Sequence, residues 1–241
     1  ALAGIATSAP GARPGEPRPL GLVEIGASAG LNLLVDRYGY RYEPDAEEIN
    51  PSSPLILHST FRSDGRPPLP IVVPHVESRA GLDLHPVDVS DPAQARWLVA
   101  CQWPDQPDRI HRARTAIALA HTEQPELITG DAVADVGDLV VRVAQFALPV
   151  VVSTWVLSYL DDDGRRALVA ELDRLAAERD LTLVFAEQPA LVAGLPLPAR
   201  PDGRPDGPET ALVKVDWRHG ERTERRLADM HPHGTWIEWL A

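Results

Sequence analysis

Glu24 and the glycine-rich turn after it are the residues whose types and spacing point most directly to chemistry. They lie in "VEIGASAGLNLL", residues 23–34, at the end of a short apolar run. Gly26, Ser28 and Gly30 fit G-x-S-x-G, the turn that exposes a nucleophilic serine in α/β-hydrolases. Together with Glu24, they also fit the acidic-x-Gly-x-x-x-Gly turn that holds a cofactor in nucleotide-binding α/β folds.

The position of this turn in the chain favours the cofactor interpretation. A hydrolase places its nucleophile turn in the middle of the sheet and needs an earlier loop to complete the oxyanion hole. Here only a proline-rich stretch precedes the apolar run. A triad order remains open, with Ser28 followed by Asp161 or Asp163 and then by His231 or His233. A third interpretation is that the small residues only permit tight packing.

Further polar residues follow the next two expected strands. A carboxylate after the second strand can accept both hydroxyl groups of a ribose, and Asp83 and Asp88 both qualify for this role. Asp131 and Ala132 follow Gly130 at the end of the third strand, where contacts to an adenine are expected. These residues occur in the order that a nucleotide site at one sheet edge requires.

The elements that must position these residues alternate between strand and helix. Leu31, Leu34, Val35 and Tyr38 have helical spacing, and Gly39 would end that helix. Further helices are expected at about 91–103, 108–121, 133–146 and 161–180. Leu20 to Ile25 is typical of a buried parallel strand. Strands are also expected in "ELITGDA", which breaks at Gly130-Asp131, in "PVVVSTWVLSYL", which runs into a turn, and in "LTLVFAEQP". This alternation predicts a mostly parallel sheet with helices on both faces.

The domain organisation follows from where this pattern starts and stops. Residues 1–19 are expected to be an irregular lead-in, the remnant of a longer N-terminus, and residues 20–241 to be a single domain. A β-rich, hairpin-like insertion is expected at about residues 40–75, after the first helix. "TALVKVDW" and "GTWIEWL" predict a terminal antiparallel strand pair.

Composition restricts the partners. The net charge of −12 argues against nucleic acid and against anionic membranes, since both attract basic surfaces. One cysteine excludes an internal disulfide and a cysteine-built zinc site. We expect a cytoplasmic protein that acts on a small molecule, without a metal. The composition does not indicate an oligomeric state.

The sequence resembles the class I S-adenosylmethionine-dependent methyltransferases over about residues 20–190. Several stretches are also similar to an uncharacterised bacterial family, known only as a domain of unknown function, that shares this Rossmann-like fold. They are "EIGASAGLNLLVDRYGYRY", "RAGLDLHPVDVSDP", "WPDQPDRIHRARTAIALA" and "GDA". The resemblance implies S-adenosylmethionine as cofactor, contacted by Glu24, Gly26, Ala27, Ser28, Gly30, Asp83, Asp131 and Ala132. Ser28 stands where methyltransferases commonly have glycine.

A substrate site is expected after the fourth strand. Trp155 and Tyr159, in the stretch that begins at Ser153, are candidates for an aromatic wall, with core packing as the alternative. His231 and His233 are expected to be loop histidines rather than metal ligands. No catalytic residue is identified, and a non-catalytic binding protein is the alternative to a methyltransferase.

Overall fold

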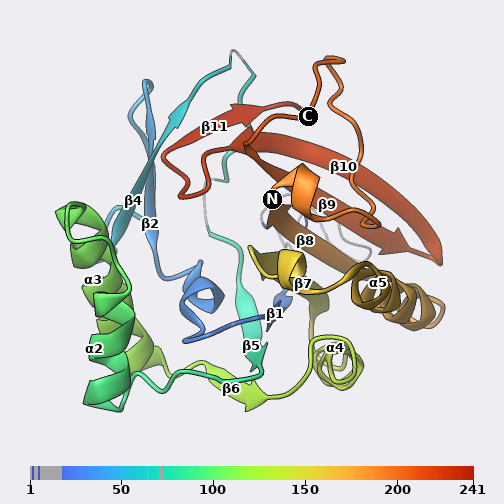
Figure 1. The fold of residues 1–241 in the computed structure, drawn as a ribbon, viewed down its shortest axis with the longest axis horizontal. Helices are drawn as coiled ribbons and strands as arrows, with labels where there is room; N and C mark the ends of the chain where they lie inside the picture. Colours follow the sequence, from blue (N-terminus) through green and yellow to red (C-terminus); the bar gives the residue numbers. More distant parts are fainter. Residues whose placement is uncertain (1, 3–4, 6–17, 64, 71–72) are drawn as a thin grey trace.

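The computed structural model describes residues 2, 5, 18–63, 65–70 and 73–241. Within them, eleven strands form one sheet in the order β3-β2-β4-β11-β10-β9-β8-β7-β1-β5-β6 (Figure 1). The expected lead-in lies mostly outside the described residues, but Leu2 and Ile5 have helical rather than irregular backbone and Ile5 is buried. The four described α-helices are α2 Pro92–Ala100, α3 Pro107–Glu123, α4 Val136–Val143 and α5 Asp162–Ala176. None of the described helices is long and apolar enough to cross a membrane.

Five neighbouring parallel strands form one end of the sheet. They are β1 Leu20–Ile25, β5 Val76–Asp83, β6 Glu126–Thr129, β7 Leu148–Thr154 and β8 Leu181–Glu187. Every residue of β1 and β8 is buried, which explains why their sequences are nearly continuous apolar runs. The mostly parallel sheet expected from the sequence is confirmed.

The strand order changes direction at β1. From β1 the chain continues to β5 and β6 on one side, and it returns to β7 and β8 on the other side. The carboxyl ends of all five strands therefore meet at one edge of the sheet, with a crevice position between β1 and β7. Glu24, Asp83, Thr154 and Glu187 occupy the ends of four of these strands.

Different elements cover the two faces of the parallel part of the sheet. The helix α4 buries Val136, Leu139, Val140 and Val143, an i, i+3, i+4, i+7 stripe, in a core cluster that also includes α5. The other face holds a second cluster, which includes Ile5, Leu20 and Leu33. In Figure 1, α2 and α3 lie beside β2 and β4, away from α4 and α5.

The prediction of a helix after the glycine-rich turn is wrong. The chain forms only a single 3₁₀ turn, η1 Leu31–Leu34, and then turns into the strand β2, Gly39–Glu43. The Tyr38 hydroxyl donates to the Leu31 carbonyl at 2.6 Å and so satisfies a group that a longer helix would have bonded. Gly39 does not end a helix: a Cβ there would lie 2.3 Å from Cδ1 of Ile56, so glycine permits close strand pairing.

The expected insertion contains three strands that continue the sheet. Besides β2 they are β3 Glu47–Ile49 and β4 Ile56–Phe61, and β2 pairs with both. β4 also pairs in parallel with β11, Trp236–Trp239, at the end of the chain. The insertion thereby continues the main sheet through β11, whereas the sequence predicted a hairpin packed on that sheet.

The prediction of a terminal antiparallel strand pair is only partly correct. The two expected strands exist as β9 Thr210–Arg218 and β11, but β10, Glu221–Met230, lies between them and pairs with both. Its first half, Glu221 to Arg225, is exposed and polar. The sequence therefore lacks the apolar pattern that would have predicted this strand. In its second half, the buried Arg226 and Asp229 side chains form an ion pair.

Candidate functional site

The turn after β1 has an unusual backbone that its sequence explains. Gly26, Ser28 and Gly30 all have positive φ values, of 68°, 51° and 67°. A Cβ at Gly26 would lie 2.3 Å from Cγ2 of Val156, so only glycine fits at this position. Ala27 and Ala29 are buried, whereas Ser28 is exposed. The small residues thus allow β1 to turn tightly beneath the loop after β7.

This turn is bonded to the end of β5. The amides of Gly26 and Ala27 both donate to the Leu82 carbonyl, at 2.8 and 3.1 Å. The Ser28 amide donates to Oδ2 of Asp83 at 2.8 Å. The structure therefore brings the expected loop and the expected ribose-binding acid into direct contact.

Glu24 is the buried acid of this edge. Only 2% of its surface is exposed. Its Oε1 accepts a hydrogen bond from Nδ2 of Asn32 at 2.7 Å, and the same Nδ2 lies 3.1 Å from Oγ1 of Thr154. Its Oε2 is buried and has no hydrogen-bond partner. A buried carboxyl oxygen without a partner calls for an explanation, and a ligand group bound beside it is one.

Burial also changes the protonation of Glu24. Desolvation raises its pKa from 4.5 to about 8; the hydrogen bond from Asn32 opposes this rise and the charge of Asp83 adds to it. The carboxyl is therefore mostly protonated at neutral pH, and a positive charge placed beside Oε2 would favour loss of the proton. Sequence reasoning identified Glu24 but missed Asn32, whose only signal is its position two residues after Gly30.

Asp131 and Ala132 lie in the turn between β6 and α4, two strands away from β1. The Asp131 Oδ1 accepts the amides of Val133 and Ala134 at 2.8 and 2.9 Å, so this carboxylate stabilises its own turn. The half-buried Ala132 packs against the α4–α5 core. No described hydrogen bond connects either residue to Glu24 or Asp83.

Asp88, the other candidate for the ribose contact, lies in the turn before α2. Its Oδ1 accepts the amide of Ser90 at 2.8 Å. Asp83 ends β5, and its Oδ1 accepts the amide of His85 at 2.8 Å while Oδ2 holds Ser28. Of the two acids, Asp83 is the one that contacts the glycine-rich turn.

Trp155 and Tyr159 lie in the loop after β7, as the sequence indicates, but in different environments. Trp155 has a positive φ of 56°, and its indole Nε1 is buried without a hydrogen-bond partner. The Tyr159 side chain projects into solvent, with 88% of its surface exposed. A tryptophan in this strained backbone region costs about 1–3 kcal/mol, which the surrounding structure must offset.

Glu187, which sequence reasoning missed, holds this loop in place. Its Oε1 accepts the amides of Val156 and Leu157 at 2.7 and 2.8 Å, and its Oε2 has no partner. Burial raises the pKa of Glu187, while these backbone hydrogen bonds act in the opposite direction. A polar residue at the end of the apolar run β8 was the available signal.

The contacts of Ser28 do not form a nucleophile site among the described residues. No histidine hydrogen bonds to its hydroxyl. Asp161 caps α5 by accepting the amide of Gly164 at 2.7 Å. His231 and His233 pack against each other, with ring centres 5.5 Å apart, in the turn between β10 and β11.

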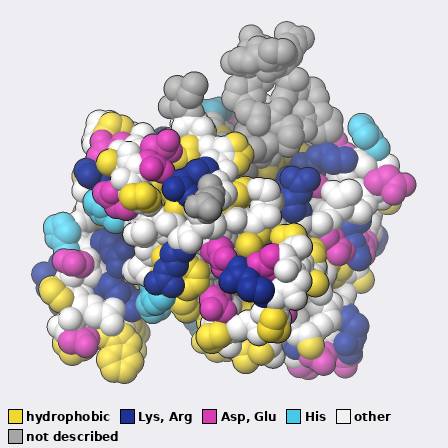
Figure 2. All heavy atoms as spheres, turned by 90° about the horizontal axis from the view of Figure 1, so that it is seen from above, with side chains coloured by type: hydrophobic (Ala, Val, Ile, Leu, Met, Phe, Trp, Pro, Cys, Tyr) yellow, Lys and Arg dark blue, Asp and Glu magenta, His cyan; other side chains and the backbone are white. Residues whose placement is uncertain are grey.

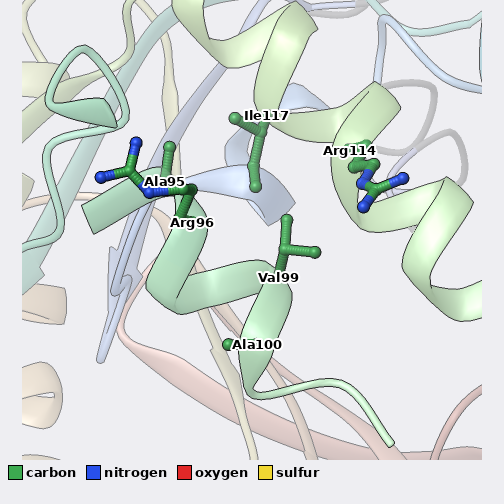
Figure 3. Close-up of a pocket in the computed structure, with 6 residues that line it drawn as sticks. All are labelled: Ala95, Arg96, Val99, Ala100, Arg114 and Ile117. Atoms are coloured by element: carbon green, nitrogen blue, oxygen red, sulfur yellow. The ribbon is translucent and has the colours of Figure 1, made fainter. Parts of the chain in front are cut away.

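Two cavities lie away from this sheet edge. One, of about 570 Å³, separates α2 from α3. Figure 3 shows Val99 and Ile117 pointing toward each other across it, with Arg96 and Arg114 at opposite sides. The other, of about 650 Å³, lies between β4, the first turns of α3 and the β10–β11 turn.

No curated protein matches the chain. Residues 1–239, nearly the whole length, match a single protein family. The chain belongs to the bacterial family described as "Uncharacterized protein conserved in bacteria (DUF2332)".

Proposed function

We propose that the chain binds S-adenosylmethionine at the edge formed by Glu24, Ser28 and Asp83 and transfers its methyl group to a small molecule. The observation that carries the proposal is the Oε2 atom of Glu24, which is buried and has no partner. It lies at the end of β1, beside the point where the strand order reverses. Open α/β sheets bind ligands at this point, and the order β6-β5-β1-β7-β8 corresponds to that of dinucleotide-binding sheets.

The residues present fit such a cofactor. Glu24 offers a carboxyl group to its cationic end. Asp83 uses one acceptor position on each oxygen, and because each carboxylate oxygen has about two, both keep capacity for ribose hydroxyls. Asp131 bonds backbone amides through Oδ1 alone, which leaves Oδ2 for an adenine amino group. Ala132 would flank the adenine.

The chemistry follows from positioning and charge. The cofactor's sulfonium would supply a methyl group for in-line displacement by an acceptor, with the neutral thioether S-adenosylhomocysteine as leaving group, so the protein's main task would be alignment. Glu24 releases its Oε2 proton to solvent when a cation lies beside it, and Asn32 then holds the carboxylate through Oε1. Trp155 and Tyr159 would contact the acceptor, with Glu187 fixing their loop.

Calorimetry with S-adenosylmethionine and S-adenosylhomocysteine tests the proposal. We expect binding that strengthens from about pH 6 to about pH 8, because deprotonation of Glu24 is coupled to binding. Glu24→Gln, which keeps the shape but cannot ionise, should weaken binding at least about tenfold. Glu221→Gln, an exposed acid at the start of β10, is the matched control. Binding of neither compound would refute the proposal.

Turnover separates a methyltransferase from a binding protein that uses the same site. Incubation with methyl-labelled S-adenosylmethionine and a pool of small metabolites should transfer label to a product. Tight cofactor binding without transfer to any acceptor would favour the non-catalytic alternative.

A further inference from the structure

The cleft between β4 and α3 shares no residue with the Glu24 edge. Its lining includes His58 and Ser59 of β4 and Asp108, His111 and Arg112 of α3. β4 pairs with β11 only at Thr60 and Phe61, so β11 does not cover the β4 edge from Ile56 to Ser59. The cleft lies along this uncovered part of β4.

Basic and aromatic nitrogen-bearing side chains without partners line the cleft, and one of them, Arg112, is positively charged. Within the described part of the chain, Arg112, His58 and His111 have no side-chain hydrogen bond or ion pair. Figure 2 shows arginine and histidine side chains gathered at the left of the view, the side where Figure 1 places β4 and α3. Burial, followed by the charges of Arg109, His231 and Arg112, lowers the pKa of the neighbouring His233. The positive charges of α3 therefore face the β10–β11 turn at the cleft.

The remaining polar groups define what else a ligand must carry. The Ser59 hydroxyl is buried and has no hydrogen-bond partner. Glu43 is already paired with Arg41, whose Nε lies 3.0 Å from Oε1. Asp108 has no ion pair among the described residues, and a carboxylate only accepts hydrogen bonds. A ligand that presents donors to Asp108 as well as negative charge to Arg112 would pair with both groups.

We propose that this cleft binds a small organic oxyanion, a phosphate or a carboxylate, that also carries hydroxyl groups. The Arg112 guanidinium forms paired hydrogen bonds with the oxyanion, the arrangement in which arginine binds most strongly. Asp108 accepts the ligand's hydroxyl groups, and Leu55 and Ile56 contact its carbon atoms. Since the whole chain carries a net charge of −12, its overall field does not attract anions, and binding depends on the local positive charge of Arg112.

Calorimetry with glycerol 3-phosphate tests the charge requirement. Arg112→Gln should weaken binding at least about tenfold. Arg114→Gln is the matched control: it removes the same charge from the same helix, but Arg114 lines the groove shared with α2 (Figure 3). The control should bind like the wild type. Equal losses in both variants would overturn the proposal, because they would show only a general charge effect.

Three further probes test the ligand class. Glycerate replaces the phosphate by a carboxylate, so whichever of glycerate and glycerol 3-phosphate binds more tightly identifies the oxyanion. Methyl phosphate lacks the hydroxyls and should bind more weakly than glycerol 3-phosphate, and Asp108→Ala, which removes both acceptor oxygens, should remove this difference. No binding of either hydroxylated anion at about 10 mM would overturn the proposal. None of these measurements depends on S-adenosylmethionine, so methyl transfer and the cleft can fail independently.

Discussion

Replacement of Glu24 by glutamine tests the buried carboxyl without any ligand. In the folded chain the pKa of Glu24 is about 8, against an ordinary value of 4.5. Above pH 4.5 the unfolded chain gains stability by ionising this residue, whereas the folded chain does so only above about pH 8. The contribution of Glu24 is therefore complete below pH 4.5 and is lost progressively as the pH rises to about 8.

The size of the effect follows from the two pKa values. Each pKa unit corresponds to about 1.4 kcal/mol, so the full loss between pH 4.5 and pH 8 is about 5 kcal/mol. Between about pH 6 and about pH 8, the wild type should lose about 2 kcal/mol of unfolding free energy to this residue. Glutamine does not ionise and can still accept the Asn32 hydrogen bond.

Urea unfolding of both proteins at about pH 6, 7 and 8 measures this difference. The free energy of unfolding of Glu24→Gln relative to the wild type should rise by about 2 kcal/mol across this range. Other titrating groups cancel in the difference, and Glu221→Gln should run parallel to the wild type. A difference between Glu24→Gln and the wild type that stays constant with pH would refute the raised pKa and, with it, proton-coupled cation binding.

Three further changes test the framework around the site. Gly26→Ala should lower the unfolding free energy by about 3 kcal/mol, because the new Cβ meets Val156 at a positive φ; no loss in urea unfolding would contradict this. Asp229→Asn should cost about 1–3 kcal/mol, since two buried arginines lose their shared carboxylate but keep their other acidic partners; a thermal midpoint equal to that of the wild type would count against it. Glu187→Ala should increase hydrogen exchange at the Val156 and Leu157 amides, with unchanged exchange as the opposing result.

Much of the parallel part of the fold could be predicted, because local sequence patterns determine its strands and the start of α2. The runs that form β1, β7 and β8 are apolar because both faces of a central parallel strand are buried. The Asp91 side chain caps α2 at the amide of Ala93, as its position before Pro92 indicates. Acids directly after apolar runs were correctly placed at one edge, since the carboxyl ends of parallel strands meet there.

The rest depended on contacts between segments far apart in the chain. The strand β10 was hidden because its polar half faces solvent, while Arg226 is buried only through its ion pairs with Asp229 and Asp206. The pairing of β4 with β11 joins residues about 175 positions apart, and no local pattern signals it. The predicted helix after Gly30 stops short and the chain turns near Tyr38, because the next residues form β2 and pair with β4.

The same division holds for the candidate site. The sequence by itself determined that Glu24 would end β1 beside a turn of small residues, because an acid after a buried run must lie at the strand's end. Only the tertiary structure decided that Asn32 holds one oxygen of Glu24 and that the other oxygen is buried without a partner. It also decided that Asp83 binds the amide of Ser28. The physical reason is that burial and hydrogen bonding are properties of the surroundings, which three separate strands and a turn supply together.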